Sequence, residues 1–161
     1  MSASLRLDSF DFAILRALQH DGRITKVALA EAVNLSPSPC WERLKKLEKA
    51  GLIMGYRAQV DIRKVAPVTE VLVELTLENH KASDFRKFEK QIAEHAQVQS
   101  CWALGGGVDY MLQLVVADVD AYQRFMDGLL DAGLGIGRYF GYIVTKRIKN
   151  DPVPLIDPSK E

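Results

Sequence analysis

Residues 36 to 51 carry the start and stop signals of one helix, and this stretch constrains the fold more than any other. Ser36 can cap the helix, and Pro37 suits its first turn, where a backbone N–H would be unpaired anyway. Gly51 is a typical C-terminal stop. Three apolar side chains recur at i, i+4 and i+7: Cys40, Leu44 and Leu47. The sequence therefore predicts a helix from Ser36 to Ala50 with one buried face.

Two shorter helices are expected before it. Asp8 is a candidate N-cap for a helix that runs to about His20, where Asp21-Gly22 ends it. A second helix is predicted from Thr25 to about Val33, and Asn34-Leu35-Ser36 forms the break before the third. A helix, a short turn and a second helix match a helix-turn-helix, in which the second helix enters the major groove of DNA.

The exposed side of the third helix supplies candidate DNA contacts. Its N-terminal part is expected to reach base edges, while basic side chains approach phosphates. The predicted DNA-binding residues are Thr25, Lys26, Ser36, Ser38, Pro39, Trp41, Glu42, Arg43, Lys45, Lys46 and Lys49. Two alternatives stay open: the lysines also fit an ordinary solvated helix face, and Trp41 fits a core position at the domain boundary equally well.

The distribution of charge supports a polyanion-binding N-terminal half. The formal net charge of the 161 residues is zero. Residues 1 to 64, however, hold 11 Lys and Arg against 7 Asp and Glu, a net charge of +4, and the remainder carries −4. Such asymmetry is typical of a nucleic-acid-binding module joined to a second domain.

The second half alternates between strand and helix patterns. Expected strands are Val68 to Leu77, Val98 to Leu104, Tyr110 to Val116 and Ile136 to Ile148, and Ser83 and Asp118 cap the expected helices to about His95 and Ala132. The order βαββαβ predicts a ferredoxin-like antiparallel sheet with both helices on one face. The fold class is thus α+β, with an N-terminal three-helix domain joined by a hinge strand to a ferredoxin-like domain.

The junction between the halves gives the expected domain boundaries. Residues 53 to 62 are rich in strand formers and lack a helical period, so a hinge strand is predicted there, with 63 to 67 as its end. The expected division is 1–52 for DNA binding, 53–66 for the hinge, 67–150 for effector binding and oligomerisation, and 151–161 for an irregular, proline-containing tail.

Several function classes find no support in the sequence. No apolar run reaches the roughly 20 residues of a membrane span, and the N-terminus has no signal-peptide core. The two cysteines, Cys40 and Cys101, suggest no disulfide framework, so a cytoplasmic location is expected, with Cys40 as a small buried residue. No catalytic pairing, metal-ligand spacing or phosphate loop is present, and we expect no enzyme activity, metal or cofactor.

The same stretches resemble the Lrp/AsnC family of leucine-responsive, or feast/famine, regulators. The resemblance rests on Leu7-Asp8, on Ala-Leu-Ala-Glu-Ala-Val-Asn-Leu-Ser at 28–36, and on Cys-Trp-Glu-Arg-Leu-Lys-Lys-Leu-Glu-Lys-Ala-Gly-Leu-Ile at 40–53. It continues through the hinge at 55–61 and a Gly-x-x-Asp-Tyr turn at Gly106 to Tyr110, and covers residues 7 to 149. It implies a prokaryotic transcriptional regulator that pairs through its sheets into homodimers, which assemble further into tetramers or octamers on double-stranded DNA.

The resemblance also implies an effector site between dimers, for an amino acid or a related small molecule. The corresponding residues here are Gly105, Gly106, Gly107, Val108, Asp109, Tyr110, Leu134, Gly135 and Ile136. Glycines let a backbone approach a ligand carboxylate, and Asp109 could pair with an α-ammonium group. Alternatively, the glycines only form a hairpin that Asp109 caps. Three consecutive glycines and Val108 depart from the polar or aromatic residues that the family often has there.

The predicted function is therefore sequence-specific DNA binding controlled by an amino-acid effector. Two alternatives belong to other classes: an effector-sensing assembly protein that does not bind DNA, and a ferredoxin-like enzyme.

Overall fold

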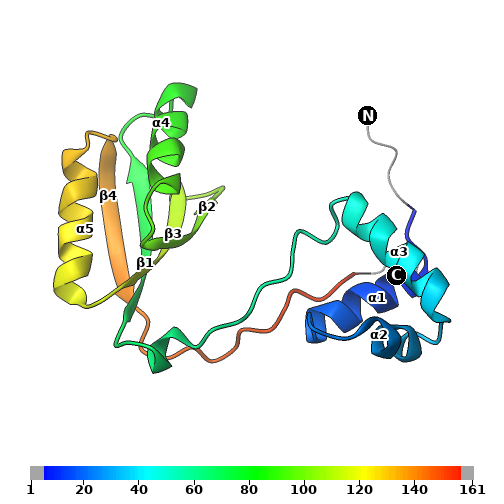
Figure 1. Cartoon of the computed structure of the whole chain (residues 1–161). Helices are drawn as coiled ribbons and strands as arrows, with labels where there is room; N and C mark the ends of the chain where they lie inside the picture. Colours follow the sequence, from blue (N-terminus) through cyan, green and yellow to red (C-terminus); the bar gives the residue numbers. More distant parts are fainter. Residues whose placement is uncertain (1–5, 157–161) are drawn as a thin grey trace. The chain divides into compact units, whose positions relative to one another are not determined.

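The computed structural model describes residues 6 to 156 and divides the chain into two compact units (Figure 1). One unit comprises the residues up to Gln59 together with the segment from Lys149 onward, and the other runs from Val60 to Ile148. Within the first unit, the C-terminal segment contacts the N-terminal helices through Val153, whose carbonyl oxygen accepts a hydrogen bond of 3.1 Å from Gln19 Nε2. Residues 157–161 of the expected tail, including Pro158, lie outside the described residues.

The N-terminal unit consists of three helices, as the sequence predicts. They are α1 (Ser9–His20), α2 (Lys26–Ala32) and α3 (Pro37–Lys49). Their shared core is formed by the buried side chains Ile14, Leu29, Ala30, Val33, Cys40, Leu44 and Leu47. Cys40 is a buried free thiol among these apolar neighbours, and burial raises its pKa. The apolar face predicted for α3 is therefore the face that holds the three helices together.

Local capping fixes where these helices begin and end. Asp8 and Asp11 form a reciprocal capping box at the start of α1. Asn34 follows α2 with φ 55°, and Leu35 N–H then donates to the carbonyl of Ala30 at 2.9 Å. Gly51 ends α3 in the same way with φ 72°. The turn of the helix-turn-helix is thus set by one residue, Asn34, in the left-handed region.

The second unit is a four-stranded antiparallel sheet in the order β2-β3-β1-β4. Its elements are β1 (Thr69–Leu77), α4 (Ala82–Ala93), β2 (Val98–Ala103), β3 (Tyr110–Val116), α5 (Val119–Asp131) and β4 (Ile136–Ile143). This confirms the βαββαβ, ferredoxin-like prediction. A strand order that places β1 beside both β3 and β4 brings the beginnings of β3 and β4 to the end of β1.

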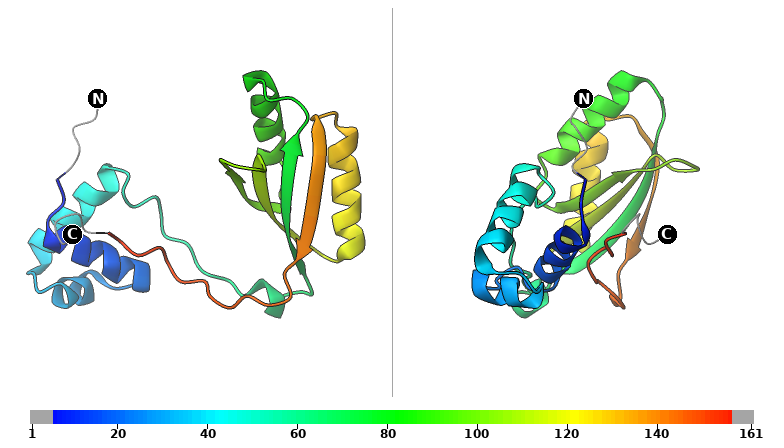
Figure 2. Two further views of the ribbon diagram at one scale, coloured as in Figure 1. Left: turned by 180° about the vertical axis from the view of Figure 1, so that it is seen from behind. Right: turned by 90° about the vertical axis from the view of Figure 1, so that its right-hand side faces the viewer.

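Both helices cover one face of the sheet (Figure 2). The side chains of β1 alternate in burial along the strand, as expected for a sheet with one covered face. The buried layer contains Val71, Val73, Leu75, Leu77, Leu112 and Leu114 from the strands and Phe88, Ile92, Met126 and Leu129 from the helices. The C-terminal unit therefore has its own core and one sheet face without helices.

That uncovered face carries a band of large side chains. Cross-strand partners share a face, so register joins Trp102 to Met111, Glu74 to Phe140, and Leu72 to Tyr142. Trp102, Phe140 and Tyr142 are 46%, 48% and 50% exposed. We call the five residues Leu72, Trp102, Met111, Phe140 and Tyr142 the open-face band. Exposed apolar surface of this kind is typical of an interaction site.

Three boundaries differ from those predicted. Helix α4 begins two residues early, with Lys81 and not Ser83 at its N-cap, because the amides of Asp84 and Phe85 already donate to the carbonyl of Lys81. Strand β4 stops at Ile143 and not at Ile148; Val144 N–H still donates to the carbonyl of Glu70 at 2.9 Å, and the chain after it forms no regular element. The expected hinge strand, residues 53 to 62, pairs with no strand of the described chain: residues 53 to 61 are irregular, and Ile62 begins a 3₁₀ turn.

Glu70 ties both connecting segments to the start of the sheet. Its side chain is only 10% exposed and accepts hydrogen bonds from Arg147 Nη2 at 2.7 Å and Gln113 Nε2 at 2.6 Å. Arg63, in the 3₁₀ turn η1 (Ile62–Lys64), lies 3.5 Å from its other oxygen. Burial alone would raise the pKa of Glu70, but the hydrogen bonds from Arg147 and Gln113 and the nearby arginine charges lower it below its usual value.

This carboxylate should make the stability of the C-terminal unit depend on pH. Because its folded pKa lies below its unfolded value, its contribution is present above the ordinary glutamate pKa and is lost as pH falls through the folded pKa. We expect Glu70→Gln to flatten the fall in melting temperature between about pH 5 and about pH 3. Glu94→Gln, at the exposed C-cap of α4, is the control. Parallel melting curves for Glu70→Gln and the wild type over this range would contradict the assignment.

Candidate nucleic-acid interface and ligand site

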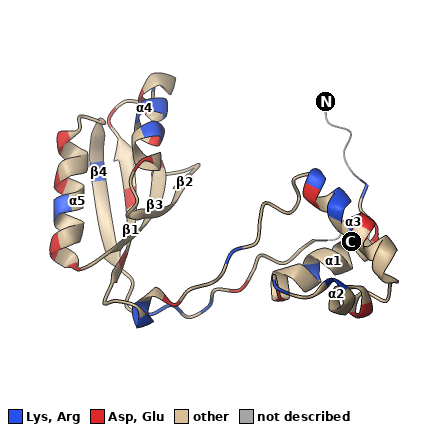
Figure 3. Cartoon of the chain, in the orientation of Figure 1, with Lys and Arg blue, Asp and Glu red and all other residues tan. Residues whose placement is uncertain are grey.

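Helix α3 presents one continuous exposed side. Its buried residues are Cys40, Leu44 and Leu47, so the side chains on the opposite side of the helix point away from the core. The predicted contacts Ser36, Ser38, Pro39, Glu42, Lys45, Lys46 and Lys49 are all exposed. Ser36 makes no side-chain capping bond, so its hydroxyl is free to bind elsewhere. The basic residues lie in the C-terminal half of α3 (Figure 3).

The start of α2 lies beside this side of α3. Thr25 caps α2 through its hydroxyl, which accepts a 3.1 Å hydrogen bond from Ala28 N–H. Lys26 lies over the ring of Trp41, with its Nζ 3.4 Å from the ring centroid, and Lys45 Nζ is 5.1 Å from the same centroid. Trp41 is half-buried and also packs against the core of the N-terminal unit. The structure therefore brings residues from two helices together around one indole.

Arg43 makes two ion pairs that the sequence did not predict. The sequence places it among the phosphate contacts, whereas in the structure its Nη1 lies 2.8 Å from Asp8 Oδ2 and 2.9 Å from Asp11 Oδ1. The side chain of Asp11 is 5% exposed, so its carboxylate needs a cationic partner. These two carboxylates raise the pKa of Arg43, while burial alone would lower it. Arg43 thus joins α3 to the start of α1, which sequence spacing did not indicate.

The glycine turn and Asp109 form the end of the β2–β3 hairpin. Asp109 makes three hydrogen bonds to backbone groups. Its N–H donates to the carbonyl of Leu75, its carbonyl accepts from Leu104 N–H, and its Oδ2 accepts from Leu77 N–H at 2.8 Å. The same Oδ2 lies 3.1 Å from His80 Nε2. The side chain of Asp109 therefore fastens the end of β1 and the β1–α4 connection to the hairpin.

The other predicted effector residues divide between surface and core. Gly105, Gly106 and Gly107 are exposed, and Val108 is half-buried. Tyr110 is buried, and its hydroxyl donates to Glu89 at 2.8 Å. Burial and this bond raise its pKa, so the hydroxyl stays a neutral donor. Leu134 is buried in the core, while Gly135 and Ile136 are half-buried.

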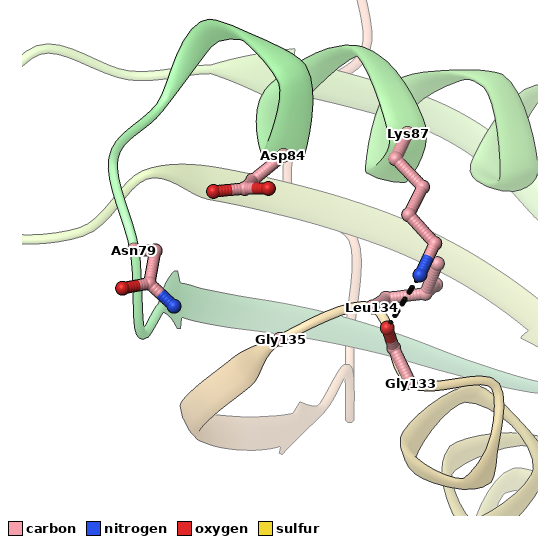
Figure 4. Close-up of a pocket in the computed structure, with 6 residues that line it drawn as sticks. All are labelled: Asn79, Asp84, Lys87, Gly133, Leu134 and Gly135. Atoms are coloured by element: carbon pink, nitrogen blue, oxygen red, sulfur yellow. Dashed lines mark hydrogen bonds between the residues drawn. The ribbon is translucent and has the colours of Figure 1, made fainter.

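A cavity of about 170 Å³ lies beside the second predicted loop. It is lined by Asn79, Asp84, Lys87, Gly133, Leu134 and Gly135 (Figure 4). Gly133 and Gly135 have φ of 61° and 69°, which turns the backbone of the loop around the buried Leu134 side chain. Lys87 Nζ donates to the carbonyl of Gly133 at 2.8 Å. Opposite charges from the first two turns of α4 thus face an exposed loop.

The sequence missed the three polar side chains of this cavity. Asn79 lies on the β1–α4 connection, and Asp84 and Lys87 lie on α4. Among the ion pairs of residues 6–156, none joins Asp84 to Lys87. Their i, i+3 spacing, which puts both on one helix face, was the only signal in the sequence. The β1–α4 connection carries Asn79, which lines the cavity, and His80, which contacts Asp109. This connection therefore lies between the two predicted effector segments.

Neither a metal-binding cluster nor a membrane-spanning helix occurs among the described residues. Residues 6–156 hold no group of three or more His, Cys, Asp or Glu side chains placed to bind a metal ion. None of the helices described there is long and apolar enough to cross a membrane.

Comparison with known families and proteins identifies both units. Residues 70–154 match the Lrp/AsnC ligand binding domain, and residues 7–54 match a winged helix-turn-helix DNA-binding domain. The chain is 48% identical over 145 residues to the transcriptional regulatory protein DoeX of Halomonas elongata, covering 90% of this chain and 92% of that protein. It is 37% identical to the leucine-responsive regulatory protein of Haemophilus influenzae, covering 89% and 86%.

A solved structure extends this likeness to three dimensions. A transcriptional regulator from Neisseria meningitidis in complex with L-Met superposes with a TM-score of 0.86 at 35% identity. The match covers 92% of this chain and 97% of that one. The similarity therefore includes both units and the segments that connect them.

Proposed function

The chain belongs to the Lrp/AsnC family of DNA-binding transcriptional regulators, and from this premise we propose that a small α-amino acid controls it from the cavity beside Gly133–Gly135. As a regulator it is not an enzyme. The observation that carries the proposal is that two opposite charges, Asp84 and Lys87, line the same cavity beside the amide of Asn79. The L-Met bound to the Neisseria regulator is an amino acid, which supports the ligand class.

The chemistry of the cavity suits a zwitterion. Asp84 accepts an α-ammonium group, and Lys87 and Asn79 donate to an α-carboxylate. Lys87 uses one donor on Gly133, and its ammonium has two more. Cavities of about 150 Å³ take up molecules the size of benzene, so 170 Å³ suits a small amino acid or a close derivative. Asp109, which the sequence nominated for the ammonium group, instead contacts Leu77 and His80, on the connection that carries the lining residue Asn79.

We further propose that the regulator works as an oligomer. The open-face band offers an apolar, helix-free surface on which two copies can pair through their sheets. Asn79 and Lys87 are exposed at the cavity, so a neighbouring protomer can reach a ligand bound there. Ligand binding then changes contacts between protomers, and with them the spacing of the DNA-binding units. Assembly from dimers into tetramers or octamers remains part of this proposal.

For DNA, we propose that the N-terminal end of α3 reads bases and that its lysines bind phosphates. Ser38, Pro39 and Glu42 are exposed at that end. Lys45, Lys46 and Lys49 follow on the same helix and carry the sequence-independent part of the affinity. Ser38→Ala is accordingly expected to change which DNA sequences are preferred.

Thermal unfolding of the full chain with each of the common amino acids tests the effector site. A ligand at a hundredfold excess over its Kd stabilises by about 2.7 kcal/mol, on the order of 10 °C for a domain of this size. We expect one or more small amino acids to have this effect, and Asp84→Asn or Lys87→Met to abolish it. Lys90→Met makes the same charge change on α4 outside the cavity and should keep the response.

Three outcomes count against parts of the proposal. Stabilisation of the wild type by no amino acid or amino-acid derivative would contradict amino-acid control. A response that survives in both cavity variants would place the effector elsewhere. A response that Asp109→Asn removes and Asp84→Asn keeps would make Asp109 the ammonium partner.

A further inference from the structure

We propose that Trp41 is neither a base contact nor only a core residue, but a platform that holds Lys26 and Lys45 together as one phosphate-binding unit. The two ammonium groups come from different helices, α2 and α3. Both lie at the indole, 3.4 Å and 5.1 Å from its centroid. A cation is attracted to the face of an aromatic ring within about 6 Å, and tryptophan attracts it most strongly.

Packing fixes the position of the Trp41 indole ring. Trp41 is half-buried and packs against the core of the N-terminal unit. The left-handed Asn34 sets the turn between α2 and α3, so Lys26 approaches the ring from a fixed direction. Lys26 Nζ at 3.4 Å occupies a ring face that a base would need for stacking or methyl contact. These contacts account for Trp41 better than either alternative that the sequence left open.

The two lysines are available to an anion. Among the ion pairs of residues 6–156, none involves Lys26 or Lys45. Two like charges gathered at one ring repel each other, and an anion that contacts both relieves the repulsion. On a surface that binds DNA, the group with this chemistry is a backbone phosphate. The unit thus adds affinity for any sequence, and its loss reduces the salt dependence of binding.

The test measures the affinity of the full chain for a random-sequence DNA duplex by fluorescence anisotropy between about 50 and 200 mM salt. Each phosphate contact contributes about 0.9 to the slope of log K against log salt concentration. We expect Trp41→Leu, which keeps bulk but has no aromatic face, to lower this slope by about 1 and affinity near 0.1 M salt roughly fivefold to tenfold. Trp41→Phe keeps an aromatic face and should preserve most of the slope.

Two further comparisons separate this role from a structural one. Trp41→Leu should have no additional effect on the slope when Lys26 and Lys45 are both methionine, because the unit is already lost. Ser38→Ala should leave the slope unchanged. An unchanged slope in Trp41→Leu, or equal slope losses in Trp41→Leu and Trp41→Phe, would overturn the proposal. So would a slope change confined to one preferred DNA sequence. The test uses no effector, so its result is independent of the proposed amino-acid site.

Discussion

Phe140→Glu is expected to dissociate the protein into monomers and to weaken its binding to a DNA with two half-sites by about a hundredfold. Phe140 is 48% exposed in the open-face band, on the edge strand β4, so a partner that pairs with this face buries it. A carboxylate there would lose its water without a cationic partner, and its register neighbour is Glu74, a second carboxylate. An aromatic hot-spot residue of an interface contributes at least about 2 kcal/mol, more than a tenfold change in dimer affinity.

The loss of DNA affinity follows from the loss of pairing. Two linked DNA-binding units bind two half-sites with a high effective concentration for the second contact, which adds a factor of about 10² to 10⁴. A monomer makes only one of these contacts. Sedimentation equilibrium gives the mass of the variant, and anisotropy with one-site and two-site duplexes gives the affinities. Only the two-site affinity should fall.

Val119→Glu provides the matched control for this variant. Val119 is 51% exposed in the first turn of α5, in the helical layer that covers the other face of the sheet. The substitution adds the same charge to an equally exposed apolar position, where a helix N-terminus favours it. It should leave both the mass and the two-site affinity unchanged. A dimeric Phe140→Glu protein would mean that the open-face band is not the pairing surface.

The features predicted correctly from the sequence are those encoded within a few residues. Asp8, Asp118 and Gly51 act as caps because capping depends on neighbouring amides and carbonyls, and the structure confirms each. The buried face of α3 and the alternation of β1 follow from periodicity, so they were also predictable. Ser83 failed as a cap because its hydroxyl lies 3.3 Å from Asp84 Oδ1 while the backbone starts α4 earlier.

The features that the sequence missed depend on residues far apart in the chain. The cavity combines α4 with a loop about 50 residues later, and only the strand order brings the two together. The Lys26–Trp41 contact depends on the angle between α2 and α3. The hinge was predicted as a strand from composition, yet a strand needs a neighbour, and the described chain supplies none. Composition indicates what a segment can form, whereas packing decides what it contacts.

Arg43→Met is expected to lower the free energy of unfolding of the N-terminal unit by about 2 kcal/mol, on the order of 10 °C in melting temperature. Removing one partner of a fully buried ion pair costs about 3 to 5 kcal/mol. A smaller loss of about 2 kcal/mol is expected here, because the Arg43 side chain is 31% exposed and Asp8 is 49% exposed, so water screens part of the interaction. Most of the loss comes from Asp11, whose carboxylate remains buried without its cation.

Two variants test this cause directly. Arg43→Lys restores the charge but replaces the planar guanidinium with a single ammonium, so it should recover only part of the stability. Adding Asp11→Asn to Arg43→Met removes the uncompensated buried charge while keeping an oxygen that can accept the Asp8 N–H, and should also recover part. A double variant that is no more stable than Arg43→Met would show that the loss arises from packing of the arginine side chain.

Lys46→Met separates stability from phosphate binding, because it removes the same charge from the same helix at an exposed position. It should leave the melting temperature unchanged and weaken binding to every DNA sequence, as the sequence predicted for Arg43 itself. Arg43→Met should lower the melting temperature without DNA present, and the salt slope measured well below that temperature should fall less than in Lys46→Met. A normal melting temperature with a reduced salt slope in Arg43→Met would show that Arg43 binds phosphate. It would also show that the buried carboxylate of Asp11 does not need this arginine for stability.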